Sequence, residues 1–112
     1  MNRDELVELF RKIQARPGMY LHAGVEFWML VGYVYGIETS GVSELQGFQG
    51  WVSQEYSGWP TSPICWDGII AESVTKDAGR WNLTVQESKE ACDRTLSSLI
   101  AYCEGLGEPN EV

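Results

Sequence analysis

The stretch Val25–Ile37, VEFWMLVGYVYGI, is the most apolar part of the chain and decides its fold. Glu26 is its only charged residue, and only Gly32 and Gly36 interrupt the apolar run. The run is shorter than the ~20 residues that a bilayer requires, and it is longer than a usual strand, so it predicts a helix. Because apolar side chains fall all round the helical wheel, we expect the rest of the protein to cover this helix on most sides.

Gly32 and Gly36 are four residues apart and therefore share one face of the predicted helix. A glycine destabilises a helix interior by about 1 kcal/mol relative to alanine. Two glycines on one face therefore predict a close approach by a neighbouring helix.

Apolar residues at helical spacing predict one helix on each side of this stretch in the chain. The first helix runs over residues 3–15 and ends before Pro17, because the residue before a proline leaves the helical region. Its apolar stripe contains Leu6, Phe10 and Ile13. After the apolar stretch, Ser43 is predicted to cap a helix that extends to Tyr56 or Ser57.

Two capping patterns predict the remaining helices. Ser62 followed by Pro63 should open a helix, because proline is favoured at the first helical position. The apolar stripe of that helix contains Trp66, Ile69, Ile70 and Val74. Thr84 and Glu87 match a capping box, which opens a final helix to about Glu104.

The predicted architecture is all-α, a compact single-domain bundle of about five helices around a buried central helix. Residues 1–107 form the domain, and residues 108–112 are expected to be a disordered tail. Three cysteines without CxxC spacing, a charged first helix with no signal peptide before it, and no transmembrane segment favour a cytoplasmic protein with reduced core thiols.

The charge of the chain is strongly negative and unevenly distributed. The formal net charge of −8 argues against binding to nucleic acid and to anionic membranes. Residues 24–74 contain six acidic side chains, no Lys or Arg, and four of the five tryptophans. Acidic charge beside aromatic residues favours a basic protein partner, and a surface that merely aids solubility is the alternative.

The sequence contains no Walker loop, dinucleotide fingerprint, HExxH, paired CxxC or Gly-x-Ser-x-Gly motif. His22 is the only histidine, so a metal cluster or catalytic triad based on histidine has no second member. We therefore predict that the protein is not an enzyme and holds no metal or cofactor. The alternative is a hydrolase or transferase that uses His22 and a carboxylate.

Several short strings together resemble one family. They are Arg16-Pro-Gly-Met-Tyr-Leu21, Gly32-Tyr-x-x-Gly36, Gly47-Phe-x-x-Trp51 and Gly58-Trp59 with Ser62 and Trp66-x-x-Ile69-Ile70. They resemble small bacterial proteins encoded beside polymorphic toxins, the immunity proteins of contact-dependent growth inhibition systems. The likeness covers roughly residues 6–75.

The resemblance implies a cytoplasmic, non-catalytic binder of one toxin domain, often a basic nuclease. Such a protein is expected to be a monomer when free, or a heterodimer with its toxin. An acidic regulator or adaptor unrelated to toxins, such as a nucleic-acid mimic, is the alternative function. The Arg16–Leu21 string also has a structural interpretation, a Pro-Gly turn whose Met19, Tyr20 and Leu21 fill the core.

The expected toxin-binding surface combines carboxylates with two aromatic anchors, Tyr56 and Trp59. Its residues are Glu38, Glu44, Glu55, Tyr56, Trp59, Asp67 and Glu72. Trp59 lies in a Gly-Trp-Pro turn, where it is either held at the surface or buried. The alternative interface is the last helix around Glu87, Glu90 and Asp93.

Overall fold

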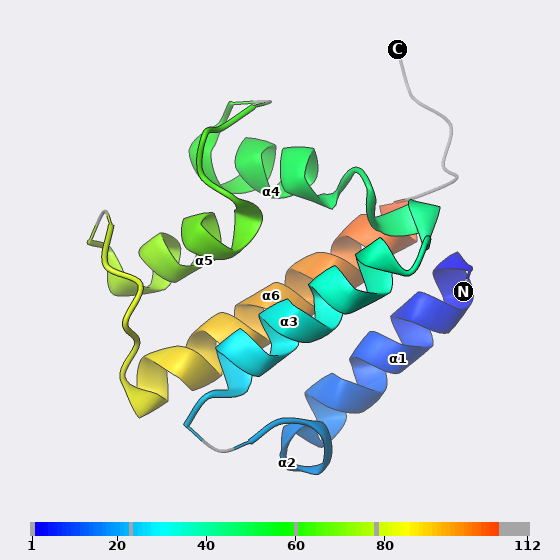
Figure 1. Cartoon of the computed structure of the whole chain (residues 1–112), viewed down its shortest axis with the longest axis horizontal. Helices are drawn as coiled ribbons and strands as arrows, with labels where there is room; N and C mark the ends of the chain where they lie inside the picture. The colour runs from blue at the N-terminus through cyan, green and yellow to red at the C-terminus, as the bar shows by residue number, and fades with distance from the viewer. Residues whose placement is uncertain (1, 23, 60, 78, 106–112) are drawn as a thin grey trace.

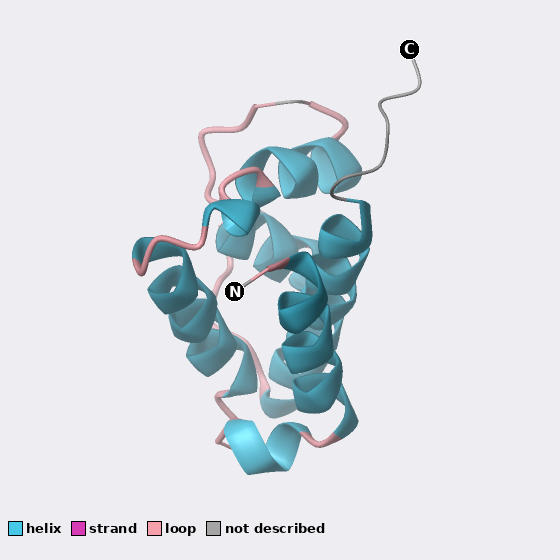
Figure 2. Ribbon diagram, turned by 90° about the vertical axis from the view of Figure 1, so that its right-hand side faces the viewer, coloured by secondary structure: helices cyan, strands magenta, loops and turns pink. Residues whose placement is uncertain are grey.

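The computed structural model describes residues 2–22, 24–59, 61–77 and 79–105, and the predicted tail lies outside them. Its elements are α1 (Arg3–Ala15), α2 (Pro17–Tyr20), α3 (Glu26–Thr39), the 3-10 turn η1 (Ser43–Leu45), α4 (Phe48–Ser57), α5 (Trp66–Thr75) and α6 (Val85–Gly105). No strand occurs in the described residues, so the all-α prediction is confirmed (Figure 2). None of the described helices has the length and apolar character needed to span a membrane.

The long helix α6 lies at the centre of the bundle (Figure 1). It contacts α1 and α3 on one side and α4 and α5 on the other. The apolar helix α3 packs chiefly against α6. The helix that contacts most others is therefore α6, whereas the prediction gave that place to α3.

Local capping sets the ends of α1 and α6. Asn2 and Glu5 form a capping box at the start of α1, since each side chain bonds the other residue's backbone N–H group. The predicted capping box of α6 is confirmed by the same pair of bonds between Thr84 and Glu87, at 3.0 and 3.1 Å. Both helices begin where a side chain replaces a missing helical hydrogen bond.

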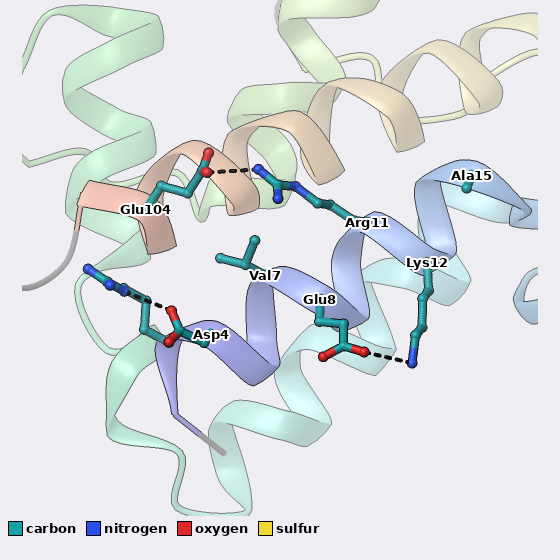
Figure 3. Close-up of a pocket in the computed structure, with 8 residues that line it drawn as sticks. Asp4, Val7, Glu8, Arg11, Lys12, Ala15 and Glu104 are labelled. Carbon is teal, nitrogen blue, oxygen red and sulfur yellow. Dashed lines mark hydrogen bonds and ion pairs between the residues drawn. The ribbon is translucent and has the colours of Figure 1, made fainter.

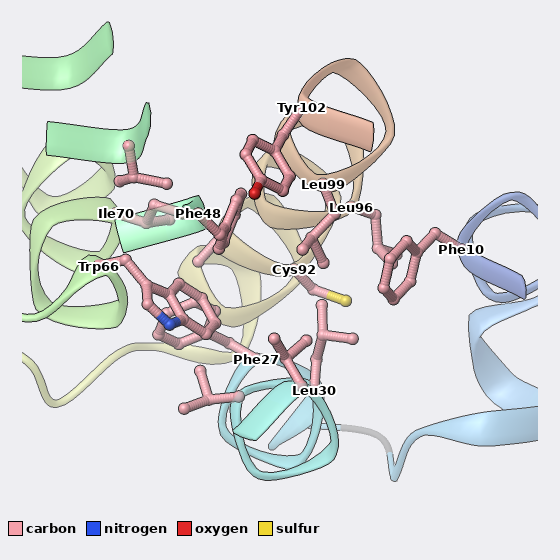
Figure 4. Packing of buried hydrophobic residues seen from close by; sticks show 14 of the residues in the cluster. Phe10, Phe27, Leu30, Phe48, Trp66, Ile70, Cys92, Leu96, Leu99 and Tyr102 are labelled. Atoms are coloured by element: carbon pink, nitrogen blue, oxygen red, sulfur yellow. The ribbon is translucent and has the colours of Figure 1, made fainter. Parts of the chain in front are cut away.

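Side chains from three helices meet in the core between α1, α3 and α6 (Figure 4). Phe10 points from α1, and Phe27 and Leu30 point from α3, toward Cys92 and Leu96 of α6. All five are buried. The stripes predicted for α1 and α5 are buried as expected.

Aromatic rings join α4 and α5 to α6. Phe48 packs against Trp66 and Tyr102 with ring centroids 5.2 and 5.5 Å apart, in edge-to-face geometry (Figure 4). Trp51 lies beside Phe48 and Tyr102. The Trp66 indole N–H is buried and has no hydrogen-bond partner among the described residues.

The prediction that Ser43 caps one long helix is wrong, because Tyr102 interrupts the helix. The Tyr102 hydroxyl accepts a bond from the Gly47 N–H at 3.1 Å and donates to the Glu44 carbonyl at 2.7 Å. Both backbone groups would otherwise bond within the helix. A 3-10 turn therefore forms at Ser43–Leu45, and α4 begins only at Phe48.

The prediction that Ser62 and Pro63 open the next helix is also wrong. Cys65 is the N-cap of α5, and Ser62 instead accepts a local bond from the Ile64 N–H. The cap comes from α4, where the Gln49 side chain accepts from the Trp66 N–H at 2.6 Å and donates to the Ile64 carbonyl at 3.0 Å. A residue far away in sequence thus fixes the start of this helix.

The prediction that α3 is covered on most sides fails along one face. Trp28, Met29 and Tyr33 are exposed, and a Cβ atom added to Gly32 or Gly36 would meet nothing within 4 Å. No helix of the described chain therefore approaches the glycine face. The reason is that α3 packs against the rest of the described chain from one side, chiefly on α6 and through Tyr35 on α5.

Two smaller predictions also need correction. Of the three residues expected to fill the core from the Pro-Gly turn, Leu21 is buried, whereas Met19 and Tyr20 are exposed. Cys92 and Cys103 are buried thiols as expected, but Cys65 is exposed.

A candidate protein-binding surface

The turn after α4 presents Trp59 to solvent, with 70% of its surface exposed. Gly58 ends α4 in the left-handed conformation at φ 76°, which glycine adopts without strain. The Ser53 hydroxyl donates to the Trp59 carbonyl at 2.7 Å, and the Gln54 side chain donates to the Gly58 carbonyl at 3.3 Å. The backbone under Trp59 is therefore held while its indole stays free.

Glu55 lies on the last turns of α4, close in sequence to Trp59, and is exposed. It has no ion-pair partner among the described residues. The segment from η1 to the end of α5 contains no Lys or Arg, so its field on nearby solvent is negative. Glu55 and Trp59 together offer a carboxylate and a large apolar side chain at one end of α4.

Glu38, near the end of α3, and Glu44, in η1, both act electrostatically on Tyr102 of α6. Burial raises the pKa of Tyr102, and the negative charges of both carboxylates add to this increase, although the bond from the Gly47 backbone opposes it. Both carboxylates are half-exposed. Of these two predicted residues, Glu44 lies directly beside Tyr102, since its backbone carbonyl accepts a hydrogen bond from the Tyr102 hydroxyl.

The other three predicted residues make bonds inside the protein. Asp67 accepts from the Tyr35 hydroxyl at 2.8 Å, and Glu72 accepts from the Trp81 indole at 2.8 Å. The Tyr56 hydroxyl shares a bond of 2.7 Å with the Ser98 hydroxyl of α6. Burial raises the pKa of Tyr35 far above its ordinary value, and the hydrogen bond to Asp67 and the negative charge of Asp67 raise it further. This phenol therefore keeps its proton.

A groove between α4 and α6 contains part of the alternative interface. Glu90 and Asp93 lie on its α6 side, and Trp51 on its α4 side. Arg94 pairs with Glu90 at 2.9 Å and also bonds Ser73, which reduces the negative field here. Trp51 was not among the residues predicted to bind a partner, although it lies four residues before Glu55 and on a different face of the predicted helix from Leu45.

A shallow hollow along α1 contains most of the basic residues of the N-terminal region (Figure 3). Each basic side chain there has an acidic neighbour. The pairs are Arg3–Asp4 at 3.4 Å, Lys12–Glu8 at 3.1 Å and Arg11–Glu104 at 2.8 Å. The charges of this face largely neutralise one another, so it offers little attraction to an anion.

His22 lies at the edge of a third hollow, of about 540 Å³, which Glu26 and Cys92 also line. Burial first, followed by the charge of Glu26, raises the pKa of the Cys92 thiol to about 12, so this thiol is a poor nucleophile at neutral pH. Glu26 accepts a bond from the Ser88 hydroxyl at 3.2 Å, and Ser88 accepts from the Phe27 N–H. This carboxylate thus stabilises the start of α3.

No group of three or more metal-ligating side chains occurs in the described part of the chain. Comparison with known proteins finds no matching family model, curated protein or solved structure.

Proposed function

We propose that this protein is a cytoplasmic immunity protein, which binds one antibacterial toxin domain and neutralises it without catalysis. Exposed Trp59 supports the proposal most directly. A hydrogen bond from Ser53 holds the backbone of its turn. Trp59 also lies in a segment that has acidic residues and no Lys or Arg. The toxin domain is proposed to be basic, as the substrate channel of a nuclease is.

The two parts of this surface have different physical roles. A large aromatic side chain on a held turn loses little conformational freedom on binding, which suits an interface anchor. The carboxylates of Glu38, Glu44 and Glu55 attract a basic domain over longer distances and accelerate the encounter. A nuclease needs positive charge along its nucleic-acid channel, so it presents a complementary surface.

The steering role is tested by reversing one charge and measuring binding kinetics by surface plasmon resonance. The probe is the purified domain of the toxin whose gene the proposal expects immediately upstream. Glu55→Lys should slow association and make the association rate less sensitive to salt, because steering acts before contact. The control is Glu8→Lys, which makes the same charge change on α1 and should leave the association rate nearly unchanged.

The anchor role predicts the opposite kinetic pattern. Trp59→Ala should accelerate dissociation by roughly 30-fold or more, since a hot-spot residue contributes about 2 kcal/mol or more. Tyr20→Ala, which removes an exposed aromatic from α2, is the control and should change little. Unchanged kinetics for well-folded Glu55→Lys and Trp59→Ala variants would move the interface to the groove around Glu90 and Asp93.

The enzyme alternative is tested at His22. A non-catalytic binder predicts that His22→Ala still protects cells from the toxin. Loss of protection, with folding and toxin affinity intact, would contradict the proposal.

The same surface could instead serve a regulator or adaptor, and a cell assay distinguishes the two. Expression of the protein should allow growth of cells that produce the toxin domain. If growth stays inhibited and the purified proteins do not bind, the toxin partner is wrong.

A further inference from the structure

The outward side of α3 carries an apolar surface that no other described helix covers. We call it the α3 outer face and define it by Val25, Trp28, Met29, Gly32, Tyr33 and Gly36. Val25, Trp28, Met29 and Tyr33 are 46, 36, 43 and 46% exposed. The face has no charged residue, although the chain contains sixteen acidic side chains.

The spacing along this face is that of a helix–helix seam. Val25, Met29, Gly32 and Gly36 are separated by four, three and four residues. The same spacing places the seam residues of paired helices on one line. Trp28 and Tyr33 border this line on its two sides.

The two glycines have no packing role within the described chain. A Cβ atom at either position would meet nothing within 4 Å. Glycine lowers helix stability without a compensating contact here. A close approach by another helix from outside the molecule explains both positions at once.

From these observations we infer that the α3 outer face pairs with the same face of a second copy of this chain, with the two helices antiparallel. A two-fold axis at the middle of the seam places Met29 opposite Gly32 of the second copy, and Val25 opposite its Gly36. Each larger side chain then faces a glycine, and each contact occurs twice, as a symmetric interface requires. The seam is therefore complementary to itself in shape.

The charge of the protein also favours a second copy at this face. Two copies with a net charge of −8 repel one another through most of their surfaces. Contact through the uncharged α3 outer face does not place the carboxylates of one copy against those of the other. A basic partner gains most from the acidic surface instead, so the two surfaces suit different occupants.

The exposed area sets the strength of the association. The four larger side chains expose roughly 350 Å² together, on typical side-chain areas. A standard interface buries about 800 Å² on each partner. We therefore expect a weak dimer, with a Kd of roughly 10–100 µM. This inference replaces the expected free monomer, and it does not depend on the proposed toxin.

Sedimentation equilibrium of the isolated protein, from about 5 to 500 µM, tests the dimer. The wild-type chain should change from monomer to dimer in this range. Gly32→Glu should remain monomeric throughout, because a carboxylate would face Met29 of the second copy. Ala101→Glu, on an exposed position of α6, adds the same charge and should still dimerise.

A second variant distinguishes association by shape complementarity from nonspecific apolar association. Gly32→Met adds an apolar side chain that has space in the monomer but fills the position facing Met29 of the second copy. The seam predicts at least tenfold weaker association, whereas nonspecific apolar contact predicts stronger association. Stronger association by Gly32→Met would overturn the inference. Ala101→Met is the matched control, and melting curves check that both variants fold.

Cysteine pairing tests the antiparallel register, in a Cys65→Ser background because Cys65 is exposed. Oxidation of a mixture of Met29→Cys and Gly32→Cys chains with diamide should form a disulfide between them. A mixture of Met29→Cys and Gly36→Cys chains should form less, because a disulfide needs Cα atoms within about 7 Å. Equal yields in both mixtures contradict this register.

A wild-type chain that stays monomeric at 500 µM overturns the inference. If Gly32→Glu then weakens toxin binding, the α3 outer face belongs to the toxin interface. Failure of toxin binding alone leaves the dimer measurement unaffected.

Discussion

The α1 side and the α4–α5 side of the molecule use charge in different ways. On the α1 side, basic and acidic side chains alternate, and Lys12 and Arg11 pair with Glu8 and Glu104. On the α4–α5 side, residues 43–75 contain no Lys or Arg. Aromatic rings around Phe48 attach that side to α6 instead.

The difference shows which residues a partner can use. Exposed ion pairs contribute little to stability, and their charges cancel at a distance. The α4–α5 side is attached by apolar packing, so it does not need its exposed carboxylates for folding. Those carboxylates remain available for a partner, and the variants below test this division, in order of decreasing effect.

The largest effect is expected at the aromatic junction. Phe48→Ala should lower the free energy of unfolding by about 3–5 kcal/mol, since Phe48 is buried among three other rings. Urea denaturation followed by circular dichroism measures the change. A loss below about 1 kcal/mol would mean that other contacts hold α4 and α5.

A smaller effect is expected at the hydroxyl that interrupts the helix before α4. Tyr102→Phe should lower the free energy of unfolding by about 1–2 kcal/mol, because the Gly47 N–H and the Glu44 carbonyl lose their partner. Tyr33→Phe, at an exposed ring, is the control and should be neutral. Equal stabilities for the two variants would contradict this role of Tyr102.

Glu26 is the one buried carboxylate in the described part of residues 24–74, and it predicts that the stability of the fold depends on pH. Burial raises the pKa of Glu26, but bonds from the backbone of Glu26 and Gly24, a bond from Ser88 and the charge of Lys89 together lower it below 4.5. A lowered pKa in the folded state means that ionised Glu26 stabilises the fold above about pH 4.5, and that this contribution disappears as the pH falls through the folded value.

Glu26→Gln should therefore melt at a lower temperature than wild type at pH 7. The two melting curves should converge as the pH falls through the lowered pKa of Glu26 in the folded state. Thermal melts between pH 7 and pH 3 measure the difference, and a difference that grows on acidification would contradict the prediction.

The smallest effect is expected on the α1 side. Arg11→Ala should change the free energy of unfolding by no more than about 0.5 kcal/mol, because both partners of the Arg11–Glu104 pair are more than half exposed. A double-mutant cycle with Glu104→Ala at two salt concentrations isolates the pair. A coupling above 1 kcal/mol would show that this side also depends on its charges for folding.

Helices with an apolar stripe along one side could be predicted well from the sequence. Residues 3–15 are helical and bury Leu6, Phe10 and Ile13 as expected, because the stripe and the flanking proline both act locally. The capping box at Thr84 fixed the start of α6 for the same reason. Interactions within four residues are visible in the sequence alone.

The starts of α4 and α5 could not be predicted, because distant side chains decide them. Tyr102 reaches Gly47 across 55 residues, and Gln49 caps Trp66 across 17. The seven residues expected to form one surface differ in their exposure and hydrogen-bond partners for the same reason. Asp67 accepts a half-buried hydrogen bond and Glu72 an exposed one, while Glu55 and Trp59 are exposed.

The sequence by itself determined that this chain is all-α, that its acidic charge is concentrated in residues 24–74, and where locally capped helices begin. Only the tertiary structure decided that α6 occupies the centre, that Trp59 is exposed, and that the glycines of α3 face solvent. The physical reason is that α3 is apolar all round, so its sequence gives no periodic difference between a buried and an exposed side. Packing against α6, together with the stacking of Tyr35 on Trp66 of α5, selects which side of α3 is buried.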